Sequence, residues 1–216
     1  MIKIENTEIY GWHSAIRGMR NPLNSWDKSD SYFDSNKQLM EIGENDLSLM
    51  IRLSKAGSDH SKYLRMINVT CDIIAPRLFY HQLDTYKVST VSNSCSTMHR
   101  IMAKPFELED FSYEKLGYDG MSHLEKTIEL LNFYRDKYIK GEDWNYLTKQ
   151  DFWNEVIYSL PQSYNQKRTW QANYQVLKNI YLSRKNHKIT EWHDFCSWIE
   201  TLPYAKELIC LKGDEQ

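Results

Sequence analysis

A short polar stretch in the middle of the chain, residues 90–100, is the first candidate for chemistry. It reads TVSNSCSTMHR and separates two apolar runs. Asn93, Ser94, Ser96 and Thr97 can each donate and accept hydrogen bonds, and Arg100 closes the stretch with a positive charge. A surface loop would have this composition, and so would a cradle of backbone and hydroxyl groups for a polar ligand.

A second candidate region follows Leu160-Pro161, where two amides and a guanidinium recur along one segment: Asn173, Asn179 and Arg184. An amide supplies both a donor and an acceptor, which suits the edge of a flavin or a pyrimidine. On an ideal helix these three side chains would not share one stripe, so a ligand site requires the helix to loosen near Arg184. The alternative is a helix with ordinary exposed polar residues.

Other familiar catalytic and metal-binding patterns are missing. The seven histidines form neither an HxxxH nor an HxH pair, and the four cysteines form no CxxC pair. The sequence contains no GxSxG elbow, no GxGxxG loop and no Walker loop. Cys95 and His99 have helical spacing, which is too weak a pattern for a nucleophile and its base. We therefore predict no metal site and assign no catalytic residue.

The overall charge is nearly balanced, because 27 basic and 29 acidic side chains give the 216 residues a net charge of −2. A dedicated nucleic-acid-binding protein would be strongly basic. The polar N-terminal segment does not resemble a secretion signal, and the apolar runs are too short to cross a bilayer. We expect a cytoplasmic protein with neither a membrane nor a nucleic-acid partner.

Periodicity predicts a mostly helical chain with a small sheet. Residues 1–43 are rich in turn-forming residues and are expected to be irregular, apart from a short strand over 2–9. Apolar and polar residues alternate over 66–74, which predicts a strand with one buried face that Ala75-Pro76 ends. Helices are expected over 45–56, 77–86, 123–140, 148–160, 167–184, 190–201 and 203–211.

The order of these landmarks resembles the flavin-dependent thymidylate synthases over roughly residues 45–195. The signature of that family runs Arg-His-Arg, two residues, Ser, one residue, then Asn-Glu-x-Ser-x-Arg, and it follows a strand that ends in Ala-Pro and a helix. Its core corresponds here to Asn93-Ser94-Cys95-Ser96. Downstream, the family's Leu-Pro, Trp, Asn, Asn and Arg correspond to Leu160-Pro161, Trp170, Asn173, Asn179 and Arg184, and His60 stands where members often have a His.

Several charged residues of the family signature are replaced. The Arg-His-Arg falls on Tyr86-Lys87-Val88, Ser94 replaces the Glu, and Met98 replaces the Arg that holds the substrate phosphate. The basic residue that usually precedes the Leu-Pro is Ile157. Cations that could compensate are Lys87, His99, Arg100, Arg17 and Arg20.

The resemblance implies an α+β fold, in which residues 44–216 form one mostly helical domain with a small antiparallel sheet after the irregular segment 1–43. It also implies that a one-carbon unit passes from methylenetetrahydrofolate to C5 of dUMP or a related pyrimidine nucleotide. FAD is the implied cofactor, NADPH a cosubstrate, and a homotetramer with active sites between subunits the implied assembly. The implied cofactor-binding residues are His60, Lys87, Asn173 and Asn179, and the implied substrate-binding residues are Ser94, Ser96, Arg100 and Arg184.

Two other interpretations stay open because of the replaced residues. The chain could be a diverged homologue that binds flavin or nucleotide without methyl transfer. It could also be a helical interaction protein without enzymatic activity, in which residues 90–100 are only a loop.

Overall fold

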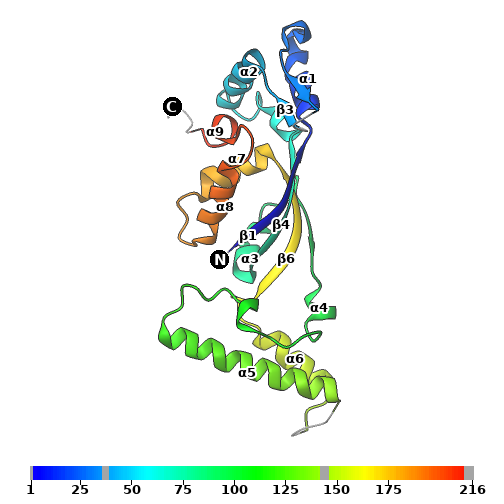
Figure 1. The fold of residues 1–216 in the computed structure, drawn as a ribbon, viewed down its shortest axis with the longest axis vertical. Helices are drawn as coiled ribbons and strands as arrows, with labels where there is room; N and C mark the ends of the chain where they lie inside the picture. The colour runs from blue at the N-terminus through cyan, green and yellow to red at the C-terminus, as the bar shows by residue number, and fades with distance from the viewer. Residues whose placement is uncertain (1, 36–38, 142–145, 212–216) are drawn as a thin grey trace. The chain divides into compact units, whose positions relative to one another are not determined.

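The computed structural model describes residues 2–35, 39–141 and 146–211, drawn as a ribbon in Figure 1. The strands are β1 (Lys3–Tyr10), β2 (Tyr32–Asp34), β3 (Leu39–Glu41), β4 (Asn68–Pro76), β5 (Val91–Ser94) and β6 (Asn165–Asn173). The α-helices are α1 (Trp12–Arg20), α2 (Glu44–Lys55), α3 (Arg77–Leu83), α4 (Thr97–Arg100), α5 (Tyr118–Lys140), α6 (Lys149–Ser159), α7 (Tyr174–Arg184), α8 (Glu191–Glu200) and α9 (Ala205–Leu208). Short 3-10 helices are η1 (Asn21–Leu23), η2 (Trp26–Lys28), η3 (Lys62–Arg65) and η4 (Leu108–Asp110).

Four strands form the main sheet in the order β1-β4-β6-β5 (Figure 1). A separate antiparallel pair joins β2 to β3, with Phe33 opposite Met40. The fold class expected from the sequence, a mostly helical α+β chain with a small antiparallel sheet, is confirmed.

The alternating pattern over residues 68–75 explains why β4 lies inside the sheet. Val69, Cys71, Ile73 and Ala75 are buried, while the residues between them are partly exposed. This is the period-two burial of a strand with one face on the core. The predicted strand is confirmed, and α3 begins directly after Pro76.

The chain separates into two compact units. The first contains Ile73–Thr85 and Asn93–Arg168, and its core lies around α5 and α6. Leu124 and Leu131 of α5 are buried with Val156 of α6, which confirms the predicted apolar stripe. Thr148 and Asp151 form the predicted capping box at the start of α6.

The second unit contains Ile4–Asp72, Tyr86–Ser92 and the chain from Thr169 onward. Its core is rich in aromatic side chains that pack edge to face. Trp192 lies 5.7 Å from Phe195, and Trp170 lies 5.8 Å from the same ring, measured between ring centroids. Such pairs add to the stabilisation that burial alone provides.

The N-terminal segment is more regular than the sequence predicts. The expected short strand is confirmed by β1, but the irregular structure expected over the rest of residues 1–43 is wrong where α1 forms. Trp12, Ala15, Ile16 and Met19 are all buried, and they have the i, i+3, i+4, i+7 spacing of an amphipathic helix. The division of the chain between residues 43 and 44 stays a prediction.

The expected helix over 167–184 is wrong in its first half. Residues up to Asn173 belong to β6, and α7 begins only at Tyr174. Trp170 and Ala172 are buried on alternate positions, which is strand periodicity. The polar residues between them conceal this pattern in a segment that otherwise favours helix.

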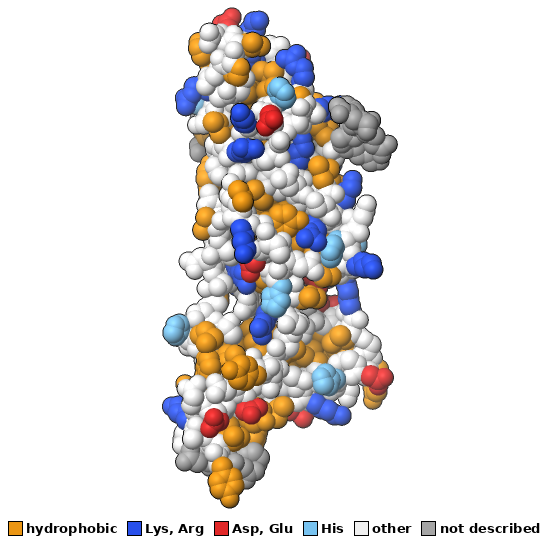
Figure 2. Space-filling model, turned by 180° about the vertical axis from the view of Figure 1, so that it is seen from behind, with side chains coloured by type: hydrophobic (Ala, Val, Ile, Leu, Met, Phe, Trp, Pro, Cys, Tyr) orange, Lys and Arg blue, Asp and Glu red, His pale blue; other side chains and the backbone are white. Residues whose placement is uncertain are grey.

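The described surface carries apolar side chains in several separate patches, with Lys and Arg side chains between them on the face in Figure 2. None of the helices in the described ranges is long and apolar enough to span a membrane.

Candidate functional site

Arg184, the last residue of α7, is held between two aromatic rings of the second unit. Its guanidinium carbon lies 5.6 Å from the ring centroid of Tyr86 and 5.1 Å from that of Trp192. Its Nε donates a 2.9 Å hydrogen bond to the Tyr86 hydroxyl. No carboxylate of the described chain pairs with this guanidinium, so its two terminal nitrogens can donate to a ligand.

Lys87 is brought near this site because it follows Tyr86 in the chain. The Thr90 hydroxyl donates to the backbone carbonyl of Tyr86 and closes the turn that carries Lys87. The Lys87 side chain is exposed, and no described residue bonds to it. It is therefore a second cation of this unit that is available to an anion.

Asn173 caps α7, which the sequence does not suggest. Its Oδ1 accepts a 3.0 Å hydrogen bond from the backbone N–H of Val176, and only 5% of the residue is exposed. This is the usual geometry of an Asn at a helix N-terminus. Only the Nδ2 group of the amide remains for a ligand.

A relay of hydrogen bonds connects Asn179 to the segment of His60. Ser61, the neighbour of His60, donates from Oγ to Oε1 of Gln175 at 3.0 Å. The Nε2 of Gln175 then donates to Oδ1 of Asn179 at 3.1 Å. The structure thus connects Asn179 to the neighbour of His60 in the chain, while the side chains of His60 and Asn179 are both exposed.

Ser94, Ser96 and Arg100 belong to the other compact unit. The stretch around them forms the exposed strand β5 and the short helix α4, and Cys95 N–H donates to the carbonyl of Lys167 in β6 at 3.0 Å. Ser96 caps α4 by accepting from the His99 N–H at 3.2 Å. Ser94 and Arg100 are exposed, and neither has a side-chain partner in the described residues.

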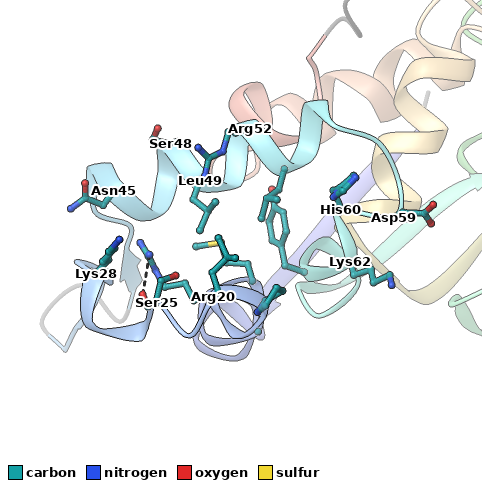
Figure 3. A pocket seen from close by; sticks show the side chains of 16 residues that line it. Arg20, Ser25, Lys28, Asn45, Ser48, Leu49, Arg52, Asp59, His60 and Lys62 are labelled. Carbon is teal, nitrogen blue, oxygen red and sulfur yellow. Dashed lines mark hydrogen bonds between the residues drawn. The ribbon is translucent and has the colours of Figure 1, made fainter.

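A basic pocket of about 810 Å³, which the sequence does not reveal, lies in the second unit between α1, α2 and η3. Figure 3 shows Lys28 and Asn45 at one end of it and His60 and Lys62 at the other. Arg52 adds a further cation from α2. These residues come from separate segments with no common motif, so no sequence signal could have grouped them.

Arg20 also lines this pocket, but two of its three guanidinium nitrogens are engaged within the protein. Its Nε donates to Oδ1 of Asp46 at 2.6 Å, and its Nη1 donates to the carbonyl of Ser25. Burial alone would raise the pKa of Asp46, but hydrogen bonds from Ser31, Ser29 and Arg20 lower it below its ordinary value. The charge of Arg20 is thus paired with Asp46, and its suggested role as a replacement phosphate ligand stays a prediction.

Three of the four thiols, two buried and one half-buried, are poor nucleophiles. Burial raises the pKa of Cys71 and of Cys196 to about 12, and that of Cys210 to about 11. Because the thiolate is the reactive form, these three side chains are inert near neutral pH. Within residues 2–35, 39–141 and 146–211, no group of three or more His, Cys, Asp and Glu side chains could hold a metal ion.

Two solved structures share this arrangement of elements. One is Thymidylate Synthase X (ThyX) from Helicobacter pylori with FAD and dUMP, with a TM-score of 0.66, 16% identity and 97% of each chain covered. The other is flavin-dependent thymidylate synthase ThyX from the same organism, complexed with FAD and dUMP. Its TM-score is 0.68 at 17% identity, covering 97% of this chain and 100% of that one. The chain has the ThyX fold.

No family model matches the chain, and no curated protein matches it. The resemblance stated from the sequence is confirmed at the level of the ThyX fold. The roles of the individual site residues stay predictions.

Two uncharged side chains, Ile157 and Met98, stand where the family signature has basic residues. Ile157 packs against the apolar core of the first unit, next to α5. Met98 of α4 is 56% exposed. Neither side chain can bind a phosphate, so an anionic ligand of this fold must be held by other cations.

Proposed function

We propose that this chain binds FAD and a pyrimidine nucleotide, dUMP or a close relative, and acts as a flavin-dependent thymidylate synthase-like protein. The observation that carries this proposal is Arg184, a stacked guanidinium without a carboxylate partner among the described residues, in a chain that has the ThyX fold over 97% of its length. Both ThyX structures contain FAD and dUMP.

The donors and charges of the second unit fit a flavin dinucleotide. The amide Nδ2 groups of Asn173 and Asn179 can donate to the carbonyl oxygens of the flavin ring. We assign Lys87 to the negative charge of the cofactor phosphates. His60 lines the pocket that also contains Lys28, Arg52 and Lys62, which favours an anionic cofactor there.

We assign Arg184 to the pyrimidine, where its terminal nitrogens donate to a ring carbonyl. Ser94 and Arg100 are exposed on β5 and α4, and we assign them, with Ser96, to the sugar or the phosphate. The Ser96 hydroxyl accepts from a backbone N–H but can still donate its own proton to a phosphate oxygen. Arg100 supplies the charge that Met98 and Ile157 cannot.

The proposed reaction is the transfer of a one-carbon unit from methylenetetrahydrofolate to C5 of dUMP. Reduced FAD supplies the reducing equivalents when it is bound, and NADPH is the proposed source of those equivalents. The residues of this chain bind and orient the reactants, and no protein thiol takes part. The proposal includes a homotetramer in the cytoplasm.

A second candidate is a diverged homologue that binds flavin or nucleotide without methyl transfer. The observation that favours it is the loss of charge where the family binds phosphate, because Ile157 belongs to an apolar core and Ser94 lacks a carboxylate.

Tritium release from dUMP labelled at C5 tests the proposal, in a mixture with FAD, NADPH and methylenetetrahydrofolate. We expect release that depends on FAD, NADPH and methylenetetrahydrofolate and falls in Arg184→Ala. Binding of FAD and dUMP without release would select the diverged homologue. Failure to bind either compound would contradict both and favour the helical interaction protein.

A further inference from the structure

A second pocket, of about 750 Å³, is unrelated to the basic pocket and shares no lining residue with it. Three segments of the second unit form it: the junction of β1 and α1, the paired strands β2 and β3, and the end of α8 with Leu202-Pro203. Gly11 makes the junction sharp, since its φ of +96° favours glycine. Tyr10 and Trp12, on either side of Gly11, both line the pocket.

The walls of this pocket are apolar and largely aromatic. Phe33 of β2 pairs with Met40 of β3 and forms one wall with it, while Tyr10, Trp12 and Trp198 contribute rings from the other walls. Phe33 is 57% exposed and Tyr10 is 45% exposed. Large apolar side chains exposed around a concave surface indicate a binding site more often than an ordinary surface.

The polar lining atoms are mostly engaged within the protein. The Trp198 indole donates to the Thr7 hydroxyl at 3.1 Å, the Thr201 hydroxyl donates to the Trp198 carbonyl, and the Tyr10 hydroxyl bonds to Thr70. Among the lining residues in the described ranges there is no Lys, Arg, Asp or Glu. The His13 imidazole is the lining side chain that no described residue engages by a hydrogen bond.

We infer that this pocket binds a neutral, planar aromatic small molecule with one hydrogen-bonding group directed at His13. Its volume is within the range of about 300–1,000 Å³ typical of small-molecule sites. A charged ligand would lose its hydration without gaining a partner charge from the described lining residues, whereas a flat apolar ligand gains from burial and from ring contacts. The inference does not depend on the proposed function, because the two pockets have no common residue.

A matched pair of fluorescent probes tests this inference. N-phenyl-1-naphthylamine is neutral, and 8-anilinonaphthalene-1-sulfonate has the same ring system with a sulfonate. We expect saturable binding of one neutral probe per chain, at least about tenfold tighter than binding of the sulfonate. Equal affinity for the two probes, or enhancement that does not saturate, would overturn the inference.

Two neighbouring residues of β2 supply the matched variants. Phe33 lines the pocket, whereas Tyr32, which is 62% exposed, does not and points to the other face of the strand. We expect Phe33→Ser to weaken binding of the neutral probe about tenfold and Tyr32→Ser to leave it within about twofold. Equal effects of the two variants would place the probe elsewhere.

Two further titrations identify the occupant. Saturating FAD should leave the affinity for the neutral probe unchanged, and competition by FAD would assign the probe to the flavin site. Probe binding should also be independent of protein concentration. Displacement as the concentration rises would mean that a second copy of the chain fills the pocket, and would overturn the inference.

Discussion

At the scale of single residues, the environment of each arginine decides what it can bind. Arg20 is buried and bonded to Asp46, so its charge is neutralised inside the protein. Arg168 donates to both carboxylate oxygens of Asp84. Arg184 is stacked on aromatic rings, and of the described side chains only a phenol accepts from it. A planar donor fixed in this way is suited to a carbonyl or an anion.

Replacing Arg184 with Ala should weaken nucleotide binding about tenfold or more, because a charge-assisted hydrogen bond is worth about 1.5–3 kcal/mol. Calorimetric titration with dUMP in the presence of FAD measures the effect. Lys185→Ala is the matched control, since Lys185 follows Arg184 and lies 5.7 Å from the ring of Tyr181. Unchanged affinity in Arg184→Ala would exclude this residue from the nucleotide site.

Asp46 should make folding stability depend on pH. Its pKa in the folded protein is lowered, so its contribution is complete above the unfolded pKa of about 3.9 and is lost as pH falls through the folded pKa. Asp46→Asn leaves Arg20 buried without its partner charge, which should cost on the order of 3 kcal/mol near neutral pH.

Urea denaturation between pH 2 and pH 7 tests this prediction. The difference in stability between the wild type and Asp46→Asn should shrink toward acidic pH. The exposed Asp27 provides the control, and Asp27→Asn should show little difference at any pH. If the stability difference between the wild type and Asp46→Asn stayed constant with pH, the ionised Asp46 carboxylate would not be its source.

At the scale of elements, the junction of β6 and α7 shows where sequence reasoning fails. The capping box of α6 and the stripe of α5 were predictable because the local pattern agrees with the tertiary structure. The strand before Asn173 was not predictable, because its alternation is short and its neighbours favour helix. The strand conformation of β6 is determined by its pairing with β4 and β5 in the sheet.

A substitution of Asn173 separates its structural role from its proposed role. Serine caps a helix about as well as asparagine but has no amide. Asn173→Ser should therefore change the free energy of unfolding by less than about 0.5 kcal/mol, while Asn173→Ala should cost about 1 kcal/mol. FAD affinity should fall in both variants. If Asn173→Ser bound FAD with full affinity, the Asn173 amide would not contact the flavin.

Gly11 should be indispensable to the turn between β1 and α1. A Cβ at this position would lie 2.0 Å from the carbonyl oxygen of Met66, and its φ is +96°. Gly11→Ala should cost about 2 kcal/mol or more, from strain and from displacement of the neighbouring backbone.

Gly57 is the matched control for this turn. Its φ is +103°, but a Cβ there would meet no atom within 4 Å. Gly57→Ala should cost about 1 kcal/mol, from backbone strain alone. Thermal unfolding measures the stability of both variants. Equal losses of stability would show that the close contact with the Met66 carbonyl adds nothing to the cost of Gly11→Ala.

At the scale of the whole molecule, the order of landmarks was enough to predict the fold but not to complete the site. Ala75-Pro76, Leu160-Pro161 and the amide series are recognisable along the chain because each has a local signature. The basic pocket has none, because Lys28, Arg52 and Lys62 come to line one pocket only after α2 and η3 have folded. Nor could the sequence show that Arg20 is buried.

The central claim is that this ThyX fold still binds FAD and a pyrimidine nucleotide. The most direct test is the visible absorption spectrum of the protein after incubation with FAD and removal of the excess, followed by addition of dUMP. We predict a retained flavin spectrum that shifts on addition of the nucleotide. A colourless protein, or a flavin spectrum that dUMP leaves unchanged, would contradict it.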